Sequence, residues 1–197
     1  HKESSPELRK TRITFVEPKR SRDFAFLSHD YLDKGARDDR WMFIPVERKV
    51  RRIPASSRGD SFFGTDLSFD DVQSEFKFNV EEWDFEYLGE ETAAGALRHR
   101  IAGTPKSAKV ARELRYGSST ATIDADAWMP VRIEFADTRN RPLKTIEVPR
   151  IEQIEGIWTA REIVAVNHQT GHRTRFVLSD IDYIDDLPNE IFNAQNL

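Results

Sequence analysis

The densest group of residues that could do chemistry is a set of aspartates in and beside the segment SFFGTDLSFDD, residues 61–71. They are Asp60, Asp66, Asp70 and Asp71. Paired carboxylates can act as a general acid and base or bind Ca²⁺, but this spacing does not match an EF-hand loop. Ser68 precedes Asp71 by three residues, the spacing at which a hydroxyl and a carboxylate satisfy the free N–H groups of a helix start. We therefore interpret Gly64, Asp66, Ser68 and Asp71 as a structural corner that begins a short helix.

The histidines offer no clear catalytic or metal-binding arrangement. His168 and His172 are four residues apart, but Gly171 and a predicted turn lie between them, so they do not share a helical face. A solvated hairpin tip explains this pair better than a zinc site. The sequence has no cysteine, no HExxH motif, no glycine-rich phosphate loop and no GxSxG elbow. We predict no catalytic residue, no metal and no cofactor.

Basic residues gather in ERKVRRIPASSR, residues 47–58. Such a run can contact anionic lipid headgroups or an acidic partner. It can also form a solvated strand pair whose arginines meet nearby aspartates, and for a short run this second interpretation is favoured. The whole chain has a net charge of -4 and a pI of about 5.8. It therefore lacks the overall positive charge of a nucleic-acid-binding protein, and we predict no nucleic-acid partner.

The elements that must position these residues are mainly strands. In VRIEF, Val131, Ile133 and Phe135 alternate with charged residues, which is typical of a sheet with one solvated face. Two further strand patterns, residues 157–168 and 172–182, flank Gly171 and predict a hairpin. Turn signals recur at short intervals, and only two stretches, after Ser68 and at 106–114, favour short helices. The pattern predicts a large antiparallel sheet with little helix.

The length and composition fit one folded domain. A chain of 197 residues is within the size of an all-β domain, and 13 Phe and four Trp indicate a packed core rather than disorder. No apolar run reaches the roughly 18 residues of a membrane-spanning helix. The first residues, HKESSPELRK, are polar and do not resemble a signal peptide.

Several motifs, in a fixed order, resemble the outer-membrane lipoprotein-sorting protein-like family of the LolA/LolB-like superfamily. They run from about Thr11 to the C-terminus. The first motif is a strand with Trp41, Phe43, Ile44 and Pro45, and the second is Arg51, Arg52 and Ile53. The third is the segment from Gly64 to Asp71. In this segment Leu67, Phe69 and Asp70 replace the family's usual Phe, Tyr and Glu. The segments WMPVRIEFAD, IEGIWTAREIVAVNHQTGHRTRF and LPNEIFNAQNL continue the match. Their order and spacing make the resemblance specific, although no single motif does.

The resemblance implies a mainly β fold, a curved and incompletely closed antiparallel β-barrel with a few short helices plugging its mouth. It also implies an apolar cavity for acyl chains and a location in the periplasm or at the outer membrane. Family members carry several dozen residues before the segment that starts here. We therefore expect residues 1–197 to form a single LolA-like domain that lacks the family's N-terminal segment.

Two functional hypotheses follow. The first is non-enzymatic binding or transport of a lipid or lipoprotein acyl chain in the bacterial cell envelope, with an envelope transporter or lipoprotein receptor as a further partner and peripheral contact with the membrane. The residues expected to contact the ligand are Trp41, Phe43, Phe63, Phe69, Trp128, Phe135 and Trp158, although core and cavity aromatics look alike in a sequence. The alternative is a protein-interaction module or accessory subunit of an envelope transporter, without a free ligand cavity. An enzyme ranks third, because it would need an acid–base pair between this aspartate cluster and a distant partner.

Overall fold

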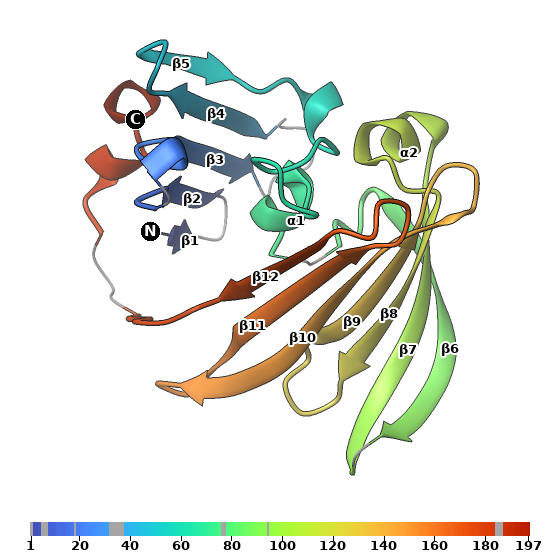
Figure 1. Ribbon diagram of the computed structural model, residues 1–197. Coiled ribbons are helices and arrows are strands. Elements are labelled where there is room, and N and C mark those ends of the chain that lie inside the picture. Colours follow the sequence, from blue (N-terminus) through green and yellow to red (C-terminus); the bar gives the residue numbers. More distant parts are fainter. Residues whose placement is uncertain are drawn as a thin grey trace. The chain divides into compact units, whose positions relative to one another are not determined.

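The computed structural model describes residues 2–4, 8–17, 19–31, 38–75, 78–93, 95–183 and 187–197, with residues 2–4 and 20 described by their backbone alone (Figure 1). The chain divides into two compact units, one formed by His1–Ser57 with Ile184–Leu197 and the other by Arg58–Tyr183. The described residues form two antiparallel sheets and a few short helices. Each sheet has an open strand order in which the first and last strands are not paired with each other. The prediction of a mainly β, incompletely closed antiparallel fold with little helix is confirmed.

The first unit contains a five-stranded sheet in the order β1-β2-β3-β4-β5. Its strands are β1 (Lys2–Ser4), β2 (Leu8–Thr14), β3 (Ala25–Tyr31), β4 (Asp39–Ile44) and β5 (Lys49–Arg52), and its short 3-10 helices are η1 (Lys19–Ser21), η2 (Ala55–Ser57), η3 (Asn189–Phe192) and η4 (Ala194–Asn196). Helix η3 packs on this sheet: the Arg12 guanidinium donates to the Ile191 carbonyl at 2.7 Å, and His29 Nε2 lies 2.8 Å from the Phe192 carbonyl oxygen. These contacts hold the C-terminal segment against β2 and β3, two strands that lie near the start of the sequence.

The second unit contains a seven-stranded sheet in which each strand pairs with its neighbour in the sequence, in the order β12-β11-β10-β9-β8-β7-β6. The strands are β6 (Trp83–Ala93), β7 (Ala96–Pro105), β8 (Ser118–Asp124), β9 (Pro130–Ala136), β10 (Pro142–Ile154), β11 (Ile157–Asn167) and β12 (Arg173–Val177). Two helices complete the unit, α1 (Phe69–Gln73) and α2 (Ala108–Leu114). The hairpin predicted around Gly171 is the pair β11–β12, and this glycine has the positive φ of 71° that the turn requires.

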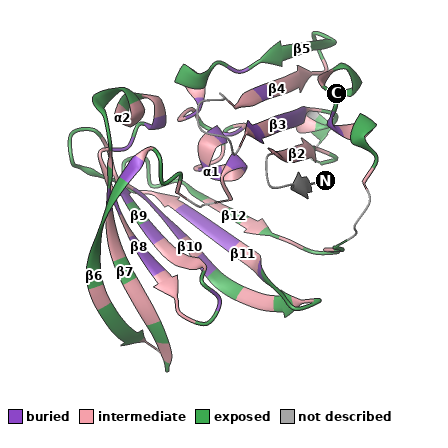
Figure 2. Ribbon diagram, turned by 180° about the vertical axis from the view of Figure 1, so that it is seen from behind, coloured by how far each residue is buried: buried purple, intermediate pink, exposed green. Residues whose placement is uncertain are grey.

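One face of this sheet, here called the inner face, carries the apolar core of the unit. The core residues are Leu67, Trp83, Leu114, Tyr116, Ala121, Ile133, Phe135, Ile146, Val148, Ile163 and Ala165. Val72 of α1 and Val110 of α2 pack against this cluster, so both helices cover the same end of the inner face. We call it the closed end. The opposite, open end contains the turns that join β6 to β7, β8 to β9 and β10 to β11. Figure 2 shows the change along the strands, from buried near the helices to exposed at the far tips.

Strand β6 forms one edge of the seven-stranded sheet. After the buried Trp83 it is exposed along most of its length, and it contains four carboxylates and no basic residue. The pairing of β6 with β7 shifts between Tyr87 and Gly89, where the glycine has a φ of 112°. A β-bulge therefore interrupts an acidic edge strand.

Candidate functional site

The corner segment of residues 61–71 forms the start of α1. Ser68 is the N-cap: its hydroxyl accepts from the Asp71 N–H at 3.0 Å, and the Asp71 carboxylate accepts from the Ser68 N–H at 2.6 Å. Phe63 and Gly64 both have positive φ values, 48° and 81°, which turn the chain before the helix. Local sequence chemistry thus explains why a helix of only five residues begins at Phe69.

Asp71 does more than cap a helix, because it forms a buried ion pair with Lys144 of β10. Both side chains are only 5% exposed. The Tyr116 hydroxyl donates to the other Asp71 oxygen at 2.8 Å, and the Lys144 ammonium lies 4.9 Å from the centre of the Tyr116 ring. Burial, and then the neighbouring Asp71 carboxylate, raises the pKa of Tyr116 well above its usual range, so this hydroxyl remains a donor. These contacts fasten α1 to the closed end of the inner face.

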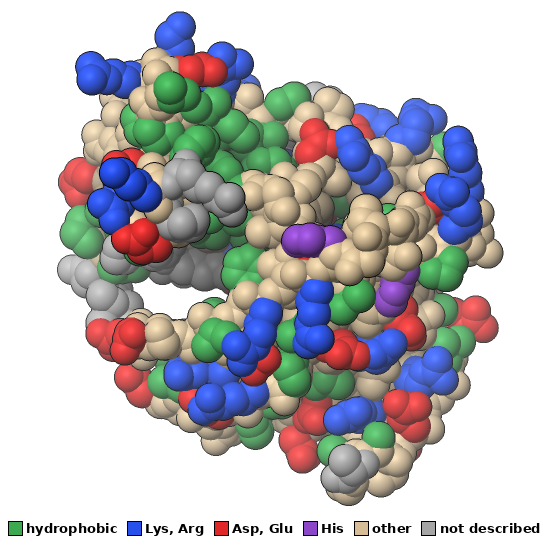
Figure 3. Space-filling model, in the orientation of Figure 1, with side chains coloured by type: hydrophobic (Ala, Val, Ile, Leu, Met, Phe, Trp, Pro, Cys, Tyr) green, Lys and Arg blue, Asp and Glu red, His purple; other side chains and the backbone are tan. Residues whose placement is uncertain are grey.

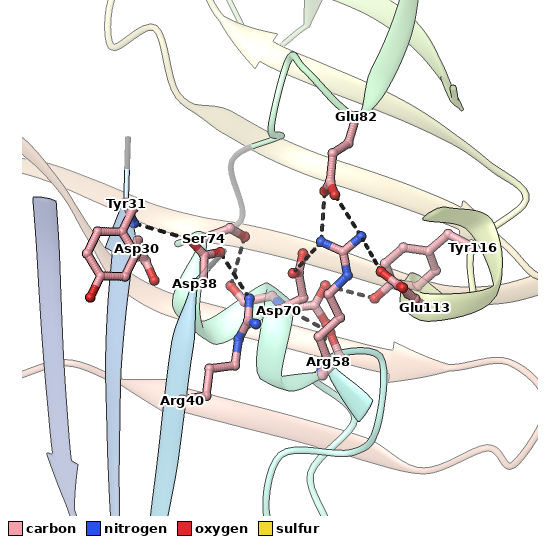
Figure 4. A network of polar contacts seen from close by, with 12 residues as sticks. Asp30, Tyr31, Asp38, Arg40, Arg58, Asp70, Ser74, Glu82, Glu113 and Tyr116 are labelled. Atoms are coloured by element: carbon pink, nitrogen blue, oxygen red, sulfur yellow. Dashed lines mark hydrogen bonds and ion pairs between the residues drawn. The ribbon is translucent and has the colours of Figure 1, made fainter. Parts of the chain in front are cut away.

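A second buried cation, Arg58, lies among three carboxylates of the same unit. Its guanidinium donates to both oxygens of Glu82, at 2.8 and 2.9 Å, and lies 3.4 Å from Glu113 and 3.7 Å from Asp70. Figure 4 shows Arg58 between Glu82 and Glu113. This residue connects the segment before β6, the helix α2 and the first turn of α1. Its arrangement is that of a structural tie, since each charge is compensated by a neighbour.

Asp66 fixes the corner segment to the start of β12. Its carboxylate accepts from the Thr174 hydroxyl at 2.6 Å and lies 2.7 Å from His172 Nδ1, while its backbone N–H donates to the same hydroxyl at 2.9 Å. The carboxylate side chain is 5% exposed, whereas the imidazole is 60% exposed. His168 instead lies 2.7 Å from the Thr145 hydroxyl of β10. The two histidines of the β11–β12 hairpin therefore have separate partners and do not share one site.

The open end of the inner face exposes aromatic side chains. Tyr87 is 58% exposed, Trp128 is 72% exposed and Trp158 is 37% exposed. The rings of His99 and Trp128 are stacked, with their centroids 5.4 Å apart and an interplanar angle of 19°, and the Tyr87 hydroxyl lies 3.2 Å from His99 Nδ1. An exposed aromatic cluster on one face of a sheet is an indication of a binding surface.

Half-buried aliphatic side chains join this cluster to the core. Ile101 pairs with the buried Ala121 across β7 and β8, and His99 pairs with Ile123, so these four residues share the inner face. On the same face, Ile151 of β10 also packs against the core. The inner face is therefore a continuous apolar surface, buried at the closed end and accessible at the open end. Such a surface can bind an apolar chain by removing it from water.

The structure distributes the seven predicted ligand residues over four places. Trp128 and Trp158 lie at the open end of the inner face. Phe135 is 7% exposed in the core at the closed end, and its ring stacks on Tyr116 with centroids 4.1 Å apart. Phe63 and Phe69 form a separate cluster with Phe62 in the corner segment.

The remaining two predicted residues, Trp41 and Phe43, belong to the other unit. Both lie on β4 and are half-buried, and Trp41 packs edge-on against His29 with ring centroids 5.0 Å apart. The four residues predicted as a structural corner, Gly64, Asp66, Ser68 and Asp71, do lie together.

Sequence reasoning missed the most connected residues. Lys144 is in phase with Ile146 and Val148, which face the core, so a lysine interrupting an apolar alternation was the available signal for a buried cation. The alternation in residues 96–101 placed His99 on one strand face with Leu97 and Ile101, whereas the contact of His99 with Tyr87 depends on the pairing of β6 with β7.

The opposite face of the sheet has a pocket of about 300 Å³. Its wall mixes apolar side chains with hydroxyl, carboxylate and amide groups, including those of Thr120, Glu134, Asn140 and Thr145. An acyl chain placed there would cover these polar groups without satisfying their hydrogen bonds, which is unfavourable. The apolar inner face is the better candidate.

The comparisons with known proteins place the chain in a family. A family model with the description "-like: Uncharacterized protein" matches residues 7–197. The structure of an outer membrane lipoprotein-sorting protein domain from Vibrio parahaemolyticus superimposes with a TM-score of 0.86 at 25% identity, covering 98% of this chain and 79% of that one. The chain belongs to the outer-membrane lipoprotein-sorting protein-like family.

Two further structures share this fold. A DUF1329 family protein from Desulfovibrio piger has a TM-score of 0.84 at 28% identity, covering 94% of this chain and 75% of that one. A LolA superfamily protein from Nitrosomonas europaea has a TM-score of 0.68 at 21% identity over 97% of this chain and 78% of that one, and it shows the shared fold alone. No curated protein matches the sequence significantly. Across the described residues, no helix has the length and apolar character needed to cross a membrane.

Proposed function

We propose that this protein is a non-enzymatic carrier of the bacterial cell envelope that binds a lipid or lipoprotein acyl chain on the inner face of the seven-stranded sheet. The single observation that supports this most strongly is the solvent-exposed aromatic cluster at the open end, which continues the apolar core. The names of the relatives, which include an outer membrane lipoprotein-sorting protein domain, point in the same direction.

The energetics favour an apolar ligand. Burial of apolar surface contributes roughly 25 cal/mol per Å², so covering exposed rings with an acyl chain stabilises the complex by several kcal/mol. At the closed end the core is filled by its own side chains, such as Phe135 and Tyr116. The chain of the ligand would therefore lie along the open half, against Tyr87, Trp128 and Trp158, with its polar end near solvent.

The test is binding of a fluorescent fatty acid to the purified protein, with native mass spectrometry of gently purified material to detect lipid that copurifies. Trp128→Ser and Trp158→Ser should each weaken binding about ten-fold, because each removes a large apolar contact. Both side chains are exposed, so neither change should unfold the sheet.

Val177→Ser provides a matched control. Val177 is also exposed, but it follows Phe176 of the inner face and therefore points to the opposite side of β12. Its replacement should leave binding unchanged. Absence of both copurified lipid and fatty-acid binding would refute the proposal and favour the interaction module. Equal loss of binding in the control would remove the assignment to the inner face.

A further inference from the structure

A second surface with a distinct chemistry lies on the β4–β5 hairpin of the five-stranded sheet. Residues 46–52 hold four cations, Arg48, Lys49, Arg51 and Arg52, against one carboxylate, Glu47. The segment thus has a net of three positive charges on a chain whose overall charge is -4. All four residues of β5 are exposed. The hairpin is therefore a local positive region on an acidic protein.

Part of this charge is compensated within the hairpin and part is not. The Arg51 Nε–H donates to the Glu47 carboxylate at 3.0 Å, and Arg52 is paired with Asp39 of β4. Among the residues that the structure describes, no carboxylate forms an ion pair with Arg48 or Lys49. These two cations at the turn are available to an external anion.

Apolar side chains stand directly beside the cations. Val46, in the turn, is 89% exposed, and Val50 on β5 is also exposed. Val50 pairs with Phe43 and Arg52 pairs with Trp41, so Val50 and Arg52 share one face of the sheet with the half-buried aromatic residues of β4. Lys49 and Arg51 lie on the other face of β5. Figure 3 shows hydrophobic side chains bordered by Lys and Arg side chains over this part of the sheet.

We propose that the β4–β5 hairpin docks the protein on an anionic phospholipid surface. Basic residues close to an anionic leaflet are attracted to its headgroups, and exposed apolar side chains between them can enter the boundary of the acyl region. An acidic protein partner would use the cations but would leave the fully exposed Val46 without a function. The combination of these cations with an exposed apolar turn therefore favours an anionic bilayer over an acidic protein as the partner of the hairpin.

The experiment is cosedimentation of the purified chain with vesicles of phosphatidylcholine mixed with phosphatidylglycerol, and with pure phosphatidylcholine vesicles. Binding is expected to the mixed vesicles alone and to weaken as salt screens the charges. Each cation strengthens binding about five-fold, so Arg48→Gln with Lys49→Gln should weaken it on the order of 25-fold. Val46→Ser should weaken it several-fold with little dependence on salt, since its contribution is apolar.

The control is Arg139→Gln with Arg173→Gln, which changes the net charge equally at exposed positions of the other unit. This variant should bind the mixed vesicles like the unchanged protein. Equal weakening in the control, binding without a requirement for phosphatidylglycerol, or no binding to either vesicle would overturn the proposal. Fatty-acid binding by the hairpin variants should remain unchanged, so the outcome is independent of the function proposed for the inner face.

Discussion

The buried ion pair between Lys144 and Asp71 makes a quantitative prediction about the closed end. Replacing Lys144 with Met keeps an apolar chain of similar length over Tyr116 and Phe135 but removes the ammonium. Asp71 then stays buried without its cation. Breaking a buried pair by removing one partner costs about 3–5 kcal/mol. For a chain of this size, a loss of about 3 kcal/mol corresponds to a fall in melting temperature of roughly 6–12 °C.

The assay is urea unfolding of Lys144→Met, with hydrogen exchange to locate the loss of protection in α1 and β10. Arg132→Met is the matched control, because Arg132 pairs with Glu147 in the same sheet but both side chains are close to half exposed. An exposed pair of this kind contributes about 0–1 kcal/mol. In a background of Asp71→Asn, the Lys144→Met change should cost far less than it does in the unchanged protein.

Three results would refute this reasoning. Lys144→Met could be as stable as the unchanged protein, the control could lose as much stability as Lys144→Met, or the cost could be the same with and without Asp71→Asn. Each outcome would mean that the buried pair does not hold α1 to the sheet. The double variant is decisive, because it separates the interaction between the two charges from the packing of the lysine chain.

Two further predictions concern the loops of the same unit. Hydrogen bonds from the Arg141 backbone N–H, then from its guanidinium and from Gln169, lower the pKa of Asp137 well below its ordinary value of 3.8. The stability from this lowered pKa is present above about pH 4 and is lost as the pH falls further. In Asp137→Asn the urea midpoint should therefore depend less on pH below about pH 4, and an unchanged pH profile would contradict this. Gly59→Ala should destabilise the fold by about 1–3 kcal/mol, because the added carbon would lie 2.5 Å from the Glu113 carbonyl oxygen. Thermal unfolding measures the change, and an unchanged melting temperature would contradict it.

Much of the second unit could be predicted from local patterns. The alternation around Ile133 and Phe135 gave the correct strand, Gly171 marked the hairpin, and Ser68 marked the start of α1. Each of these features depends on residues a few positions apart. The expectation of a single LolA-like domain over residues 1–197 stays a prediction.

The candidate site was harder to predict, because it depends on long-range pairing. Trp128 and Phe135 are both aromatic residues near one strand, yet the first is largely exposed and the second is buried. What separates them is the position of the helices, which cover one end of the inner face and leave the other open. Lys144 and Asp71 are 73 residues apart in the sequence, so no local pattern could indicate that they form a pair.

The acidic edge strand β6 has a consequence for how this protein behaves when concentrated. Unpaired strand edges recruit the edges of other molecules, and an exposed aromatic surface nearby increases the risk of aggregation. Two copies that paired through β6 would bring the carboxylates of Asp84, Glu86, Glu90 and Glu91 together, and the bulge at Gly89 would disturb their register. Repulsion at this edge lets the chain keep its aromatic cluster exposed without joining other copies into a growing sheet. Neutralising these carboxylates should therefore favour fibrous or amorphous association before it changes the fold.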